Sequence, residues 1–239
     1  QSDEYISHKK GSKGITAILY GIARSFTLRS KYSLVKKYSP GNSILDIGCG
    51  TGEFLNFCQQ KKLKCIGVEP SEKARTYAKT NYYLDVRDNF IQGVENTKRF
   101  DCITLWHVLE HIHQLDLTLE KINSLLTQEG VVIIAVPNSN SYDAGFYGIH
   151  WAAYDLPRHI YHFTRDSMRT FEDKYHFNCL TILPQKLDAF YISLLSEKYK
   201  NGSIRYLHAF FRGLISNFQA RNPEMGYSSQ IYILKRKIS

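Results

Sequence analysis

The sequence lacks the features that would place it in a membrane or in an oxidising compartment. None of its apolar runs approaches the roughly 20 residues that a helix needs to cross a bilayer. It has no Cys-x-x-Cys pair, and its odd number of cysteines is scattered at Cys49, Cys58, Cys65, Cys102 and Cys179. That pattern favours reduced thiols over a disulfide framework or a zinc site. We therefore expect a cytoplasmic protein without a bound metal.

Acidic residues are missing from one long stretch. There is none between residues 5 and 45, where eight basic residues occur: Lys9, Lys10, Lys13, Arg24, Arg29, Lys31, Lys36 and Lys37. A solvated basic face is the simplest explanation; the alternative is an anionic partner such as a nucleotide-sugar, a phospholipid surface or RNA. No RNA-binding signature accompanies the charge, so nucleic acid is not expected as a partner.

The composition is that of one globular domain, since 239 residues with 43% apolar and 22% charged side chains can bury a full core. The most informative stretch is LDIGCGTG at residues 45–52. An apolar run precedes it and a helical pattern follows, so it predicts a strand, a turn and a helix. Gly48, Gly50 and Gly52 let the backbone approach a ligand closely at a helix N-terminus.

The spacing of the glycines indicates which kind of nucleotide ligand such a turn can bind. Counting from Gly48, the sixth position of a dinucleotide fingerprint is Glu53, whose carboxylate would repel a pyrophosphate. A phosphate-loop pattern also fails, because no Gly-Lys-Ser/Thr follows. What remains is Asp46 followed by glycines at every second position; a tight turn without a ligand is the alternative.

This pattern resembles D/E-x-G-x-G-x-G, the first motif of class I S-adenosylmethionine-dependent methyltransferases. A cationic sulfonium suits an acidic turn better than a pyrophosphate does. The resemblance implies that S-adenosylmethionine binds here and leaves as S-adenosylhomocysteine, with Asp46, Gly48, Gly50 and Gly52 in the cofactor site. The backbone at Gly48 and Gly50 would lie against the methionine end, and Asp46 would order the turn.

A second acid stands at the distance that a ribose contact needs. Residues 64–70 read as a strand that ends at Glu69, 19 residues beyond Gly50, where an acid can accept both ribose hydroxyls. In the resemblance Glu69 and Pro70 form the second motif. Residues 82–86 predict a third strand with Asp85 near its end, where the family often places a polar residue against the adenine. An ordinary loop acid explains Asp85 equally well.

Residues 100–106 predict a fourth strand, followed directly by HVLEH at 107–111. This pentapeptide matches the inverted zinc-peptidase motif, in which His107 and His111 would hold a metal and Glu110 would act as base. That motif belongs within a long helix, whereas here His107 stands at the tip of a strand. The segment instead resembles the fourth motif of bacterial small-molecule methyltransferases, including those of the ubiquinone pathway. Trp106 and His107 would then line the cofactor, and His111 would point to the acceptor.

Strands and helices continue to alternate towards the middle of the chain. A helix is predicted at 115–126, stopped by Gly130, and a buried strand at 131–136. The alternation predicts a doubly wound α/β sheet, seven-stranded and mixed in the resemblance, with ligands at the carboxyl ends of its strands. The expected parts of this single domain are an N-terminal helical segment (1–41), a cofactor-binding half (42–137), an acceptor-site loop (138–163) and a helical insertion or lid (186–226).

The loop at 138–164 is dense in aromatic residues and histidines, and long loops of this kind are usually functional. Its pieces His150-Trp151 and 155–164 resemble the acceptor-facing segment of methyltransferases from surface-polysaccharide and secondary-metabolite pathways. His159 is the preferred base because a neutral imidazole accepts a proton at physiological pH, and His111 is the second choice. A hydrogen-bonded structural histidine is the alternative for each. The expected acceptor contacts are His150, Trp151, Tyr154 and Arg158.

Two caps predict helix starts: Ser71 begins a helix that runs to about residue 80, and Thr164 begins one that runs to residue 175. The rest of the chain predicts a closing strand pair at 179–184 and 229–235. Between the strands, apolar residues recur at helical spacing: Ile204, Leu207, Phe211, Leu214, Ile215 and Phe218. Packing in the core or in a lid is the preferred explanation. A membrane-surface helix serving a lipid-linked acceptor is the alternative, because arginines flank the segment.

Together these observations predict a class I methyltransferase that acts on a small molecule, with O-methylation favoured and anionic or lipid-linked acceptors included. A non-catalytic protein that keeps the cofactor fold as a scaffold is one alternative. A zinc metallohydrolase using HVLEH is the other.

Overall fold

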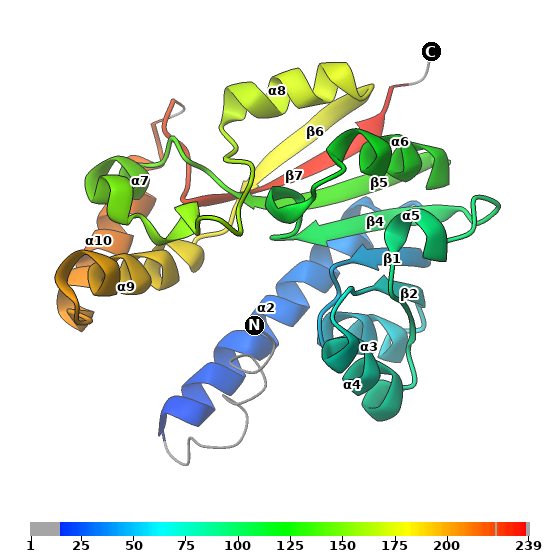
Figure 1. Cartoon of the computed structure of the whole chain (residues 1–239), viewed down its shortest axis with the longest axis horizontal. Coiled ribbons are helices and arrows are strands. Elements are labelled where there is room, and N and C mark those ends of the chain that lie inside the picture. Colours follow the sequence, from blue (N-terminus) through cyan, green and yellow to red (C-terminus); the bar gives the residue numbers. More distant parts are fainter. Residues whose placement is uncertain (1–14, 223, 238–239) are drawn as a thin grey trace. The chain divides into compact units, whose positions relative to one another are not determined.

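The computed structural model describes residues 15–222 and 224–237 (Figure 1). The chain divides into two compact units. The first unit comprises the chain as far as Thr104 together with Lys121–Val131. The second comprises Leu105–Glu120 and the chain from Val132 onward. Lys9, Lys10 and Lys13 of the predicted basic stretch lie outside the described residues. No helix among those described is long and apolar enough to cross a membrane.

Seven strands form one sheet in the order β3-β2-β1-β4-β5-β7-β6. Strands β1, β2 and β3 pair in parallel, and β6 pairs antiparallel with β7, so the sheet is mixed. This confirms the predicted α/β architecture with a seven-stranded mixed sheet. The strands are β1 (Ser43–Ile47), β2 (Lys64–Val68), β3 (Asp85–Arg87), β4 (Phe100–Trp106), β5 (Leu126–Pro137), β6 (Phe177–Pro184) and β7 (Ser229–Arg236).

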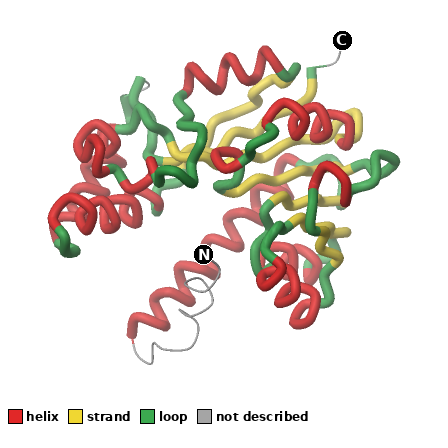
Figure 2. Tube along the Cα trace, viewed as in Figure 1, coloured by secondary structure: helices red, strands yellow, loops and turns green. Residues whose placement is uncertain are grey.

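The helices alternate with the strands through most of the chain (Figure 2). They are α2 (Ile15–Tyr38), α3 (Glu53–Gln60), α4 (Glu72–Tyr82), α5 (Phe90–Gly93), α6 (Leu115–Leu125), α7 (Tyr142–Tyr147), α8 (Arg165–Lys174), α9 (Asp188–Asn201) and α10 (Tyr206–Gln219). Short 3-10 helices are η1 (Leu109–His111), η2 (Gly148–His150) and η3 (Ala152–Tyr154). The side chains of Ile15, Ile18, Leu19 and Ile22 in α2 lie outside those described.

Capping residues set several helix starts as the sequence predicts. Ser71 accepts a hydrogen bond from the Ala74 N–H at the start of α4. Thr164 and Ser167 form a reciprocal capping box at the start of α8. Each cap satisfies N–H groups that have no partner in the first turn of a helix. The described residues thus confirm the two predicted helices that begin at these caps.

The third strand begins later than predicted. Tyr82 is the last residue of α4, and Tyr83 caps that helix in a left-handed conformation with φ of 54°. Strand β3 therefore starts at Asp85. The Tyr-Tyr pair suggested a strand because aromatic residues favour strands, but that preference is weak and the helix overrides it.

Gly130 does not stop a helix, contrary to the prediction. It lies inside β5, which begins directly after α6 and is longer than the predicted strand. A Cβ at Gly130 would stand 3.0 Å from the Phe100 carbonyl oxygen and 3.0 Å from Oγ1 of Thr127. The glycine is therefore required by a close approach of β4 to β5, which sequence alone does not reveal.

The segment at 186–226 forms two helices, α9 and α10, that pack against each other. The sequence predicted that its apolar side chains pack in the core or in a lid; packing in the core is wrong, and the lid stays a prediction. Leu207 is 77% exposed, Phe211 58% and Phe218 61%. The inner side of α10 is instead formed by the small residues Ala209, Gly213 and Ser216. Periodicity shows that a helix is two-sided, but does not tell which side faces the protein.

Candidate active site

The glycine turn and Glu69 lie together in the first unit, as predicted. The Glu69 carboxylate accepts hydrogen bonds from the N–H of Gly50 at 2.9 Å and from the N–H of Ser71 at 2.8 Å. The turn is fixed to the end of β2, because the Gly48 N–H donates to the Val68 carbonyl at 2.7 Å. An oriented carboxylate with remaining lone pairs therefore stands beside a backbone that a ligand can approach.

Each glycine of the turn has a positive φ: 74° at Gly48, 55° at Gly50 and 79° at Gly52. Side chains rarely adopt this conformation, which explains why glycine recurs at every second position. At Gly52 space is also limited, since a Cβ would lie 2.6 Å from a methyl of Leu84. At Gly50 nothing lies within 4 Å of that position, so the backbone there is open.

Asp46 lies beneath the turn rather than on its surface. Its side chain is buried and accepts a hydrogen bond from Oγ1 of Thr104 in β4 at 2.6 Å. Burial raises the pKa of Asp46 to about 7, and the Thr104 bond offsets part of that effect. The contact with Thr104 joins β1 to β4, while the predicted contact of Asp46 with the cofactor stays a prediction.

Asp46 predicts an unusual pH dependence of stability. Because its carboxyl has a pKa of about 7 in the folded chain against an ordinary 3.8, the folded state holds this proton more tightly. The free energy of unfolding should therefore fall as pH rises from about 4 to about 7, by at most about 1.4 kcal/mol per pH unit. Asp46→Asn removes the titration, so denaturant unfolding should show the variant gaining stability relative to wild type across this range. A difference independent of pH would contradict the buried proton.

Two further cofactor predictions have different outcomes. Pro70 is exposed directly after Glu69, and its carbonyl accepts a hydrogen bond from Arg75. Asp85 does not stand near the end of the third strand, as predicted; it is the first residue of β3, and its carboxylate pairs with Arg87 at 2.8 Å. The exposed acid beyond the end of β3 is Asp88. It was not predicted because the third strand was placed too early in the sequence.

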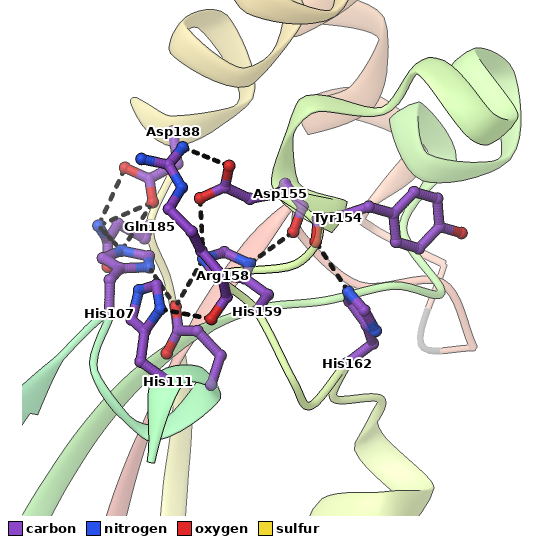
Figure 3. A network of polar contacts seen from close by, with 11 residues as sticks. His107, His111, Tyr154, Asp155, Arg158, His159, His162, Gln185 and Asp188 are labelled. Carbon is purple, nitrogen blue, oxygen red and sulfur yellow. Dashed lines mark hydrogen bonds and ion pairs between the residues drawn. The ribbon is translucent and has the colours of Figure 1, made fainter. Parts of the chain in front are cut away.

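The second unit holds a polar network that Figure 3 draws around His107 and His159. His107 follows β4 with a left-handed φ of 57°, and its Nε2 lies 3.0 Å from Oδ2 of Asp188, the first residue of α9. Burial alone would lower the pKa of His107, but the charge and hydrogen bond of Asp188 raise it to about 10, with Glu110 adding to them. His107 is therefore an imidazolium tied to α9 at neutral pH. Trp106 before it is buried, and the cofactor contacts predicted for both residues stay predictions.

The His107–Asp188 pair predicts a stability difference that disappears in alkali. The raised pKa of His107 stabilises the folded state fully below about pH 6.5, and this contribution is lost as pH rises through about 10. Asp188→Asn should therefore lower the free energy of unfolding by about 1 kcal/mol near pH 6, since both side chains are partly exposed. Denaturant titrations should show that loss shrinking as pH approaches 10. An equal loss of unfolding free energy near pH 6 and near pH 10 would contradict a charge effect.

The HVLEH segment does not form the peptidase arrangement. Only its last three residues are helical, as the 3-10 helix η1, and His107 is outside it. The Glu110 carboxylate is buried, and within the described chain neither of its oxygens accepts a hydrogen bond. Its Oε1 lies 3.6 Å from Nδ1 of His107 and 4.0 Å from Nε2 of His159. A buried carboxylate without hydrogen bonds is costly unless a cation or a proton compensates it.

His111 and His159 both present a lone pair to this carboxylate region. Their rings are 4.6 Å apart, and Nδ1 of His159 lies 2.8 Å from the Ala153 carbonyl, while Nδ1 of His111 lies 2.9 Å from the Arg158 carbonyl. A carbonyl can only accept, so each Nδ1 carries the proton when the ring is neutral. Burial lowers the pKa of His159, although the Ala153 bond and Glu110 oppose it. His159 is therefore neutral at physiological pH and able to accept a proton at Nε2.

The same three residues have the donor set that divalent cations take. One ligand atom from each of Glu110, His111 and His159 lies within 4.8 Å of the others. Imidazoles held by carbonyl hydrogen bonds at Nδ1 are the usual form of metal-ligating histidine. The cluster can hold either a proton or a cation, so the expected absence of a metal stays untested.

The four residues predicted to contact the acceptor do not all lie in one place. Trp151 is 2% exposed and its Nε1 donates to Asp143 at 2.9 Å, so it belongs to a buried core and an acceptor contact is not supported. Tyr154 is half-buried and packs against the rings of Trp151 and His162. Arg158 is exposed and pairs with Asp155. His150 is half-exposed at the end of η2.

Three acids of this network were not predicted as site residues. Glu110 was considered only as the base of the peptidase motif, and Asp155 lay within the segment that carried the acceptor resemblance. Asp155 places Oδ2 3.7 Å from Nε2 of His159. Asp188 gave no signal, because it is 81 residues away from its partner His107 in sequence.

Comparison with known proteins gives consistent matches. A family model described as a methyltransferase domain matches residues 22–182. A ubiquinone biosynthesis O-methyltransferase of Rhodopseudomonas palustris strain TIE-1 is 24% identical over 67% of this chain and 66% of that protein, just under two thirds of its length.

Two solved structures share the fold. The first is a SAM-dependent methyltransferase from Archaeoglobus fulgidus, with a TM-score of 0.61 and 19% identity, covering 89% of this chain and 94% of that one. The second is the magnesium protoporphyrin IX methyltransferase of Synechocystis PCC 6803 with bound SAH, with a TM-score of 0.59 and 14% identity, covering 95% of this chain and 90% of that one.

Proposed function

The chain belongs to the methyltransferase domain family of S-adenosylmethionine-dependent enzymes, and we propose that it transfers the cofactor's methyl group to a hydroxyl of a small-molecule acceptor. The observation that carries the cofactor assignment is the Glu69 carboxylate held by the N–H groups of Gly50 and Ser71. Its remaining lone pairs are suited to the two ribose hydroxyls. The open backbone at Gly50 is suited to the methionine end.

His159 is the proposed base of the reaction. The acceptor oxygen attacks the methyl carbon in line with the carbon–sulfur bond, which breaks as the carbon–oxygen bond forms. The hydroxyl proton passes to Nε2 of His159, and the resulting imidazolium is stabilised by Glu110 at 4.0 Å and Asp155 at 3.7 Å. The enzyme supplies alignment of the two reactants as well as this proton acceptor.

The choice of oxygen as acceptor atom rests on two observations. The buried neutral imidazole of His159 can deprotonate a hydroxyl, and the relative named above is an O-methyltransferase. A net charge of +9 places anionic and lipid-linked hydroxyl compounds first among the acceptors to be screened. The cytoplasmic location inferred from the cysteines belongs to the same proposal.

Calorimetric titration tests the proposal most directly. After carried-over cofactor has been removed, S-adenosylmethionine and S-adenosylhomocysteine should both bind with micromolar affinity. An acceptor screen that follows the formation of S-adenosylhomocysteine should then find a hydroxyl substrate. Binding without turnover of any acceptor would favour a non-catalytic scaffold, and absence of binding would overturn the proposal.

A further inference from the structure

Helix α10 displays its large apolar side chains outward. Six of them are exposed by between 36% and 77%: Leu207, Phe210, Phe211, Leu214, Ile215 and Phe218. At about 100° per residue these positions occupy one arc of about 140° on the helix. A contiguous apolar surface of this kind on a folded chain marks an interaction site.

The two basic side chains of α10 make their contacts away from that arc. Nδ1 of His208 lies 2.6 Å from Oε1 of the buried Glu197 in α9. The guanidinium of Arg212 stacks over the ring of Phe146 at 3.7 Å. Within the described chain, the outward arc of α10 therefore carries no charge, although the helix itself contains two basic side chains.

Most exposed charged side chains around α10 are basic, and the exposed acid that follows the helix is Glu224. Residues 186–222 contain two acids, Asp188 and Glu197, and both are engaged inside the unit with histidines. The exposed charged side chains of this segment are all basic: Lys186, Lys198, Lys200, Arg205 and Arg221. An uncharged apolar face bordered by lysine and arginine is the composition of a helix that lies in the interface of an anionic membrane.

We propose that the apolar face of α10 docks into the headgroup region of an anionic phospholipid surface. With 14 residues the helix is about 21 Å long, too short to cross the hydrocarbon core and suited to lying along the surface. A second copy of the chain is a poorer occupant, because joining two such faces would bring their basic borders together.

Vesicle flotation of the full-length chain tests this proposal. Vesicles that contain phosphatidylglycerol should bind the chain about tenfold or more tightly than vesicles of phosphatidylcholine alone. The double substitution Phe210→Ser and Leu214→Ser should weaken binding to the anionic vesicles by at least about tenfold. As a matched control, Leu117→Ser and Leu180→Ser alter side chains that are 52% and 50% exposed outside α10, and should leave binding unchanged.

The basic border has its own test. Replacing Lys186, Lys198 and Arg205 by Gln should weaken binding to anionic vesicles, whereas replacing Lys61, Lys73 and Lys79 of the first unit should have little effect. Absence of vesicle binding, or an equal loss in both triple variants, would overturn the proposal. The proposal would also be overturned if light scattering showed a dimer that Phe210→Ser dissociates, and if neither the wild type nor this variant bound vesicles. Since flotation needs no methyl transfer, its result is independent of the proposed function.

Discussion

Glu69→Ala is expected to weaken the binding of S-adenosylmethionine by about 100-fold. In the proposed role, Glu69 accepts hydrogen bonds from both ribose hydroxyls, each worth about 1.5–3 kcal/mol. Because every 1.4 kcal/mol is a factor of ten, about 100-fold is the lower end of the loss expected from both bonds. The substitution also removes the acceptor for the N–H groups of Gly50 and Ser71, which loosens the turn. Calorimetric titration measures the loss, and Glu72→Ala, an exposed acid three residues further on, is the matched control.

A ribose contact can be distinguished from a merely loosened turn. Wild type should bind an S-adenosylhomocysteine analogue without ribose hydroxyls far more weakly than S-adenosylhomocysteine itself. Glu69→Ala should bind the two compounds almost equally, because the group that discriminates between them is gone. If the variant still discriminates, or binds S-adenosylmethionine as tightly as wild type, Glu69 does not hold the ribose.

His159→Gln is expected to lower kcat for a hydroxyl acceptor by about 10²–10⁴-fold and to leave cofactor affinity unchanged. Glutamine keeps a hydrogen-bonding side chain of similar reach but accepts no proton at neutral pH. His162→Gln is the control, because His162 also bonds a carbonyl of the same segment, that of Tyr154. An unchanged kcat in His159→Gln would remove it as the base.

The pH dependence of the wild-type enzyme should agree with this role. The base must be neutral to accept the proton, and burial lowers the pKa of His159. Activity should therefore be constant near neutral pH and fall only as pH decreases below about 6.5, the ordinary pKa of histidine. The falling limb should be absent from the residual activity of His159→Gln. A limb above pH 7 would point to a different group.

Glu110→Gln separates a base from a cation site. If His159 acts as base, this change weakens only the stabilisation of the imidazolium, and the loss should be about tenfold. If Glu110, His111 and His159 hold a divalent cation, Glu110→Gln and His111→Gln should each cost as much as His159→Gln. Activity should then also be lost after chelation and restored by added metal. Metal analysis of the purified protein decides the same question independently.

Local patterns predicted the parts of this molecule that depend on neighbours in sequence. The glycine turn and Glu69 were found because a strand, a tight turn and a helix place them at a set spacing. The fold class followed from the alternation of strands and helices around them. The caps at Ser71 and Thr164 were equally visible, since each acts within three residues.

The remaining features depend on contacts that no spacing encodes. Asp188 lies beside His107 only in the folded chain, because the two residues are 81 positions apart in sequence. Gly130 was mistaken for a helix stop because its partner, the Phe100 carbonyl, lies 30 residues away. Trp151 was predicted to contact the acceptor because it lies in a loop rich in aromatic residues, but its indole N–H donates to Asp143 in the core.

The close approach between α9 and α10 fixes which way the second helix faces. A Cβ at Gly213 would stand 2.6 Å from the ring of Phe190, so this position on the inner side of α10 has no room even for a methyl group. Turning the helix over would drive Phe210 or Leu214 into that space. The outward apolar face is thus a steric consequence of one glycine. Until another surface covers it, this face stays exposed to water and lowers the solubility of the protein.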